Sequence, residues 1–264
     1  MEKLLSRSIM KQSVKNNWKL WAILTGVLCF FITVVIIVSH TGGGRGPNAG
    51  GPPGGNPFGE TSLDVLLANA FFSASGMAGM MMLILLITFG NKLVASEIDR
   101  GTMSFTLNTP TTRKQIIFSK TLFYVCSLVL MVTLLGTFAS VSSLAVNANM
   151  NYGNLWLVIL GLALFGFATS GICFLASCWF NKSGQSLLIG AGVPVAFFLL
   201  NSLSGLVTIN NTEFLKYFSL NTLFDTSSVL DGSGYALQFV AMAVIGMILY
   251  GIGITKFLKK DLPL

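Results

Sequence analysis

The chain has 264 residues, of which 53% are hydrophobic and 9% are charged. In a typical soluble protein roughly a quarter of the residues are charged. A soluble domain with the charged fraction of this chain could not cover its surface with polar groups. The mean hydropathy of +0.76 and the long unbroken apolar runs predict an all-α polytopic membrane protein, and they exclude a membrane β-barrel, whose strands alternate. The net charge of +7 comes from basic residues that flank these runs, so it indicates no nucleic-acid partner.

The N-terminal residues, 2–20, combine an apolar row with a basic row at helical spacing. Such a pattern predicts an amphipathic interfacial helix on the inner leaflet (1–20), with an ordinary basic flank that only sets orientation as the alternative. The apolar row is Met10, Val14 and Trp18, and the basic row is Lys11, Lys15 and Lys19.

Six apolar runs follow, each long enough to cross a hydrocarbon core of about 30 Å, which takes about 20 helical residues. We expect Lys120, the one ionisable residue inside them, to snorkel to the headgroups. We interpret the four cysteines within the runs as small buried apolar residues. The six runs are 21–39, 65–89, 116–141, 155–178, 186–207 and 235–255.

Basic residues lie almost entirely on one side of these six spans. Of the 16 Lys and Arg residues, all except Arg45 and Lys216 fall on the side of the two termini. The positive-inside rule therefore predicts that both termini are cytoplasmic. The Gly/Pro-rich segment 42–59 then becomes an external loop, which we interpret as a flexible spacer.

The last external segment, 208–234, is more apolar than a loop. Asn211 or Thr212 can cap one short helix, and Asn221 can cap another that carries Phe224 and Val229. Because these helices are too short to span and too apolar for water, we predict a re-entrant pair that covers the external exit between the last two spans.

Enzymatic chemistry has no support in the residues. The single histidine, His40, lies at the outer end of the first span, and the spans hold no pair of carboxylates and no cluster of metal ligands. Secondary transport is a weaker alternative because all Asp and Glu residues are outside the spans. Gly190, Gly192 and Pro194 interrupt span five, where we predict a packing kink whose freed carbonyl is satisfied by a neighbour.

The loop after span two, 90–115, is the expected docking place for a partner. Span two is predicted to continue beyond the membrane as a short charged helix at 95–100, to break at Gly101, and to restart at Thr109-Pro110. The chain has no Walker A sequence, so ATP would have to bind elsewhere. The charges that we expect to meet a partner are Glu97, Asp99 and Arg100.

This segment resembles the permease subunits of bacterial two-component ATP-binding-cassette (ABC) exporters, through Glu97-x-x-x-Gly101-Thr102, Pro110-x-x-Arg113 and Lys120. The resemblance implies a homo- or heterodimer of permeases on ATPase subunits, with 95–103 as the coupling helix. It also implies that ATP and Mg lie in the partner and that this chain binds no cofactor. The implied coupling residues are Glu97, Asp99, Arg100, Gly101, Thr102 and Arg113.

By the same resemblance, spans two and five line the substrate path. Aromatic, Met and amide side chains there suit an amphipathic or hydrophobic cargo, with interhelical packing as the alternative. We thus predict a single permease domain, 1–264, that exports a peptide, toxin or antimicrobial compound across the bacterial cytoplasmic membrane. A non-transporting scaffold or sensor that binds an ATPase is the competing hypothesis. The candidate path residues are Asn69, Phe72, Ser73, Met77, Phe197, Phe198 and Asn201.

Overall fold

The computed structural model describes residues 7–41, 63–101, 112–147, 150–206, 220–230, 232 and 234–260. Within these residues the fold is helical, and six helical segments are long and apolar enough to cross a membrane. The prediction of an all-α, six-span membrane protein is therefore confirmed. The six segments are Met10–Val38, Leu67–Leu93, Arg113–Ala145, Tyr152–Trp179, Ser183–Asn201 and Tyr235–Lys259.

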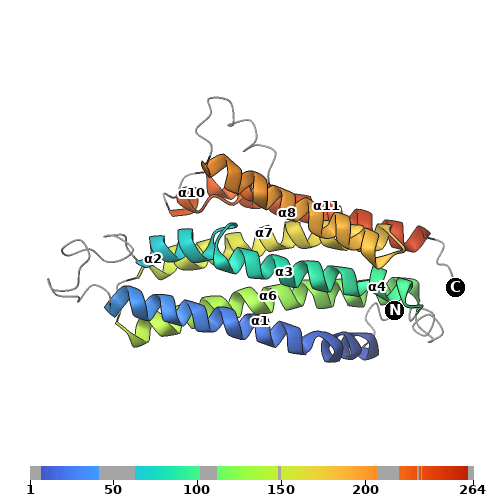
Figure 1. Ribbon diagram of the computed structural model, residues 1–264, viewed down its shortest axis with the longest axis horizontal. Coiled ribbons are helices and arrows are strands. Elements are labelled where there is room, and N and C mark those ends of the chain that lie inside the picture. The colour runs from blue at the N-terminus through green and yellow to red at the C-terminus, as the bar shows by residue number, and fades with distance from the viewer. Residues whose placement is uncertain are drawn as a thin grey trace.

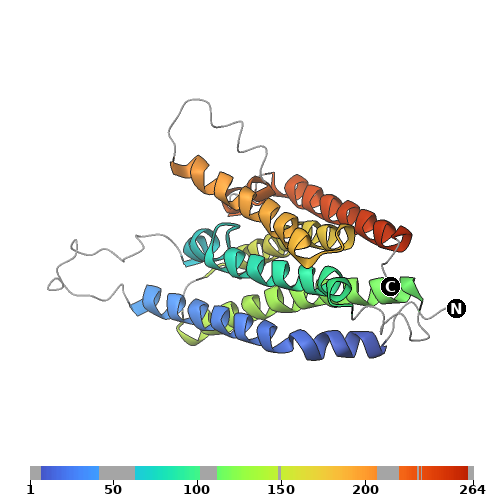
Figure 2. The same cartoon turned by 45° about the vertical axis from the view of Figure 1, so that its right-hand side comes forward.

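The long helices pack in three layers, with α7 (Tyr152–Trp179) at the centre. In Figures 1 and 2, α1 (Arg7–Thr41) and α6 (Arg113–Ala145) lie below α7 and α3 (Met77–Leu93), and α8 (Ser183–Leu206) and α11 (Tyr235–Lys259) lie above. Helix α7 contacts α3, α6, α8 and α11. The starts of α1 and α6 and the ends of α7 and α11 share one end of the bundle, here called the basic end.

The N-terminal segment continues directly into the first span. Residues 7–41 form one continuous helix of 35 residues, which at about 1.5 Å per residue is much longer than the hydrocarbon core. No Gly or Pro separates the basic row from the apolar run, so nothing in the sequence breaks the helix there. The described part of 1–20 is therefore continuous with the first span, and its place at the inner leaflet stays a prediction.

Span two is broken, which the sequence did not indicate. It consists of α2 (Leu63–Leu66), the π-helix η2 (Leu67–Phe72), a turn over residues 73–76, and α3. The Gly76 N–H closes the turn on the Ser73 carbonyl at 3.0 Å. Gly79 lies so close to the Ser73 and Ala74 carbonyls that a Cβ there would overlap them. The backbone of the break therefore requires glycine, which has no side chain, at position 79.

Span five, α8, contains Pro194 within one continuous helix. A proline removes the hydrogen bond to the carbonyl four residues earlier, here that of Gly190. Cys173 of α7 donates its thiol to this carbonyl, with Sγ 3.1 Å from the oxygen, so the predicted satisfaction by a neighbouring helix is confirmed. Cys29, Cys173 and Cys178 are buried as expected, whereas Cys126 is exposed on α6.

The segment before the last span, which the sequence predicts to be external, is described from residue 220 onward, apart from residues 231 and 233. It holds a short 3-10 helix, η3 (Leu220–Leu223), and α10 (Thr226–Leu230). Asp225 accepts the Ser227 N–H at 3.1 Å and so caps α10, while the side chain of Asn221, the predicted cap, lies outside what the structure describes. Phe224 is buried and stacks on Phe165 of α7. The second half thus packs into the bundle, while 42–59 and the Asn211 or Thr212 helix lie outside the described residues.

Candidate functional site

A joint at Val94 connects the second span to the short helix α4 (Ala95–Asp99) at the basic end. Val94 has φ −130° and ψ −60°, so the helix ladder is interrupted there. The Ala95 N–H leaves the ladder and donates to the hydroxyl of Ser177 on α7, at 3.0 Å. The Glu97 N–H bonds to the Val94 carbonyl at 3.1 Å instead of the Leu93 carbonyl, which an unbroken helix would use.

Lys120 of α6 donates a hydrogen bond to the Leu93 carbonyl, which has no helical partner because the joint interrupts the helix. Its Nζ lies 2.6 Å from that oxygen and also pairs with the Glu97 carboxylate. Lys120 is only 2% exposed, whereas the Glu97 side chain is 34% exposed. The prediction that Lys120 snorkels to headgroups is therefore wrong, because a freed carbonyl and a carboxylate within the protein hold its ammonium.

The charged end of α4 faces outward. Asp99 and Arg100 are exposed, and Gly101 ends the segment at φ +69°, a conformation that favours glycine. The rim of α4 therefore presents one acidic and one basic side chain to the surroundings of the bundle. Of the predicted coupling residues, Thr102 lies outside the described residues.

Arg113 lies at the same end, as the first residue of α6. Helix α6 begins there, and Thr109-Pro110, where the sequence predicts a restart of the helix, lies outside the described residues. Thr112 and Gln115 form a capping box, with the Gln115 N–H donating to the Thr112 hydroxyl at 3.4 Å and the Thr112 N–H to the Gln115 side chain at 3.1 Å. This box fixes where the third span starts.

Two further side chains, Lys260 and Asn91, tie other elements at the basic end. Lys260, which follows α11, donates to the carbonyls of Cys178 and Phe180 at 3.0 and 2.9 Å and so caps the end of α7. Burial lowers the pKa of Lys260 below its ordinary value. The Asn91 side chain donates to the hydroxyl of Ser183 at 2.8 Å, which ties α3 to the start of α8. The basic end is thus bonded across spans two, four, five and six.

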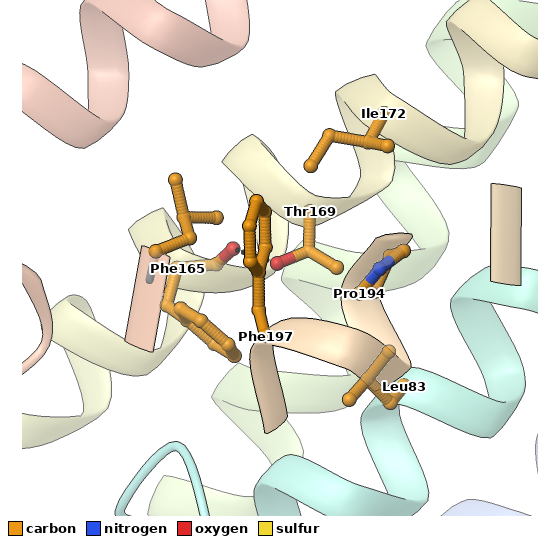
Figure 3. A pocket seen from close by; sticks show the side chains of 7 residues that line it. Leu83, Phe165, Thr169, Ile172, Pro194 and Phe197 are labelled. Carbon is orange, nitrogen blue, oxygen red and sulfur yellow. Dashed lines mark hydrogen bonds between the residues drawn. The ribbon is translucent and has the colours of Figure 1, made fainter. Parts of the chain in front are cut away.

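The seven predicted path residues all lie within the described part of the chain. Phe197 alone among them lines the crevice of Figure 3, and the other lining residues are Leu83, Phe165, Thr169, Ile172, Pro194 and Leu220. Figure 3 shows the Phe197 ring beside Phe165 and Thr169 of α7. The crevice is apolar and narrow.

The other path residues have separate surroundings. Phe72 is fully buried in the core, which favours the packing alternative for it, and Met77 packs against the core. Asn69 accepts a hydrogen bond from Thr226 of α10 at 2.6 Å. Ser73 lies in the turn that breaks span two, and Phe198 and Asn201 are half-buried on α8.

Sequence reasoning missed the two side chains that secure the joint, Lys120 and Ser177. Lys120 carried a signal, because a lone ionisable residue in an apolar run is costly and usually has a partner. Ser177 carried none, since a serine in a span commonly bonds its own helix. The short charged helix α4 is thus held by three spans: it follows span two in the chain and is bonded to α6 and α7.

Comparison with known proteins supplies the family. Residues 9–262 match the family described as ABC-2 family transporter protein, which covers nearly the whole chain. No curated protein was found to match the chain. The family fits the six apolar helices, since it describes a membrane subunit of a transporter, and it implies an ABC ATPase partner. The chain with the broken second span and the fastened helix α4 belongs to the ABC-2 family of transporters, as a permease subunit.

Proposed function

We propose that this permease exports an amphipathic or hydrophobic compound, a peptide or toxin first and a lipophilic antimicrobial second, by alternating access. Two permease copies, or a copy and a paralogue, sit on two ATPase subunits that bind ATP and Mg. The basic end faces the cytoplasm. The ATPase closes on ATP, moves α4 and switches access to the path between spans two and five.

The observation that carries this proposal is the position of α4. A five-residue helix with exposed Asp99 and Arg100 projects from the basic end, and the part-buried Lys120–Glu97 ion pair holds it against α6. A helix held in this way transmits force and does not merely tether a partner. The apolar crevice around Phe197 and the largely uncharged spans support a hydrophobic cargo.

Reconstitution tests the proposal. The permease is co-purified with the ATPase subunit and placed in sealed vesicles whose ATPase faces outward, with a dye-labelled amphipathic peptide and a lipophilic dye as probes. ATP is expected to drive probe accumulation in the vesicle lumen. Binding of the ATPase with ATP turnover but without uptake of either probe would favour the scaffold hypothesis.

Charge reversals test the docking surface in the same complex. Arg100→Glu or Asp99→Lys is expected to reduce co-purification or ATP turnover at least five-fold while membrane insertion stays intact. The matched control is Lys182→Glu, an exposed reversal in the turn between α7 and α8. Full assembly and turnover in both α4 variants would contradict the assignment of α4 as the coupling helix.

The sidedness is tested separately. In a chain with the exposed Cys126 replaced by Ser, a membrane-impermeant maleimide is expected to label Ser227→Cys in intact cells. Lys182→Cys is expected to react only after the membrane is opened. The reverse pattern would invert the proposed orientation.

A further inference from the structure

Side chains from two different spans bond to the backbone groups that the joint at Val94 leaves without a helical partner. The Ala95 N–H bonds to Ser177 of α7, and the Leu93 carbonyl bonds to Lys120 of α6. Both side chains are buried, at 0% and 2% exposure. Neither of these side chains belongs to span two, so the backbone groups that the joint sets free are bonded by neighbouring spans.

We propose that Lys120, with Ser177, is a positioning residue that couples α4 to the third and fourth spans, so that a displacement of α4 moves α3, α6 and α7 together. This inference rests on the proposed function of α4 as the coupling helix. It adds that the force leaves α4 through Lys120 as well as through the covalent chain of span two.

Polar bonds suit this task better than apolar contacts. In a membrane, apolar side chains that lose a protein contact meet lipid tails of similar character, so such contacts resist sliding weakly. A buried ammonium that leaves Glu97 and the Leu93 carbonyl would be an unpaired charge, which is strongly disfavoured. The Lys120 bonds therefore persist while the helices that they join change position.

Two contacts carry the tie further along α3 and α6. The Tyr124 hydroxyl donates to the Leu86 carbonyl at 2.6 Å. Phe123 stacks on Phe89 with the ring centroids 6.1 Å apart. Both contacts lie within one turn of Lys120 on α6, so α3 and α6 are bonded over consecutive turns next to the joint.

If Lys120 only stabilised the fold, its replacement would lower stability without altering how ATP moves the spans. The test therefore measures movement in the intact complex. Spin labels are placed on Val141 near the end of α6 and on Leu237 of α11, both exposed, with Cys126 replaced by Ser. The distance between the labels is measured by pulsed electron resonance without nucleotide and after trapping with ATP and vanadate.

The wild-type complex is expected to show an ATP-dependent change in this distance. Lys120→Met is expected to lose at least half of that change while vanadate trapping by the ATPase continues. The matched control is Lys256→Met, which removes a lysine from the basic end of α11, where it lies 4.2 Å over the Trp179 ring. This control is expected to keep the full change.

The outcomes separate the two proposals. An unchanged distance shift in Lys120→Met overturns the role of Lys120 and leaves the coupling role of α4 in place. Failure of the wild-type chain to bind an ATPase overturns the proposed function itself. If Lys120→Met does not assemble, Glu97→Gln replaces it, because this variant leaves Lys120 its bond to the Leu93 carbonyl; a full shift there overturns the inference.

Discussion

The indole Nε1 of Trp21 donates a hydrogen bond to the main-chain carbonyl of Ser127 at 3.0 Å. These residues are 106 positions apart, and the same separation lies between Arg7 and Arg113, the first residues of α1 and α6. The two helices run side by side in the same direction (Figure 1). The basic N-terminal segment therefore begins level with the start of α6.

Trp21→Phe should lower stability modestly. The phenyl ring keeps most of the packing, and the Ser127 carbonyl lies within a helix, so the loss is that of one hydrogen bond, about 1 kcal/mol. We expect the apparent Tm in detergent to fall by about 2–4 °C. The matched control, Trp156→Phe on the exposed face of α7, should leave the Tm unchanged; an equal fall in both variants would contradict a specific role for the Trp21 bond.

Glycine at position 79 should be required for the break in span two. A Cβ there would lie 2.7 Å from the Ser73 carbonyl oxygen and would also overlap the Ala74 carbonyl. Because backbone atoms cannot move aside as a flexible side chain can, we expect Gly79→Ala to cost about 1–3 kcal/mol.

Gly192→Ala on α8 is the matched control, since the added Cβ would meet nothing within 4 Å. Alanine is the better helix former by up to about 1 kcal/mol, so this variant should be neutral or more stable. Thermal unfolding in detergent checks both. Equal stability of the two variants would mean that residues 73–79 form a regular helix.

The spans were predictable because hydropathy and bilayer thickness fix their number and length. The break at Ser73 was not, since its residues are apolar or small and equally allow a helix. Lys120 was misread for a related reason. Its partner, the Leu93 carbonyl, becomes available only because Val94 leaves the helix, and no local pattern marks Val94. The capping role of Asp225 was also not predicted, because the sequence pattern placed the cap four residues earlier, at Asn221.

The hydrogen bond from Thr226 to Asn69 should tie α10 to span two. The Thr226 hydroxyl lies 2.6 Å from the Asn69 side-chain oxygen, and Thr226 is buried. We expect Thr226→Val and Asn69→Ala each to destabilise the chain by about 1 kcal/mol. The double variant should be little worse than either single variant, because both remove the same bond, which gives a coupling energy of about 1 kcal/mol. Strictly additive losses in a double-mutant cycle would contradict the tie.

Asp225 should stabilise α10 at neutral pH and less in acid. Burial alone would raise the pKa of its carboxyl, but hydrogen bonds from Ser227 and Ser228, at 2.7 to 3.1 Å, outweigh it and hold the pKa below its ordinary value. Because the pKa is lowered in the folded state, the carboxylate stabilises the fold to its full extent at pH values above the pKa of the unfolded chain, about 3.9. This stabilisation disappears as the pH falls through the folded value.

Hydrogen–deuterium exchange of residues 224–230, corrected for the intrinsic effect of pH, checks this expectation. Protection should be constant from about pH 5 to 8 and should decrease below about pH 4, where the carboxylate takes up a proton. Asp225→Ala should lower protection at pH 7 by about 1 kcal/mol, as for other lost helix caps, and should remove the acid dependence. Residues 152–158 at the start of α7 are the internal control, since the Asn151 amide that caps them does not titrate. Equal protection of 224–230 in Asp225→Ala and the wild-type chain at pH 7 would contradict the cap, because the lost hydrogen bonds would then contribute nothing to α10.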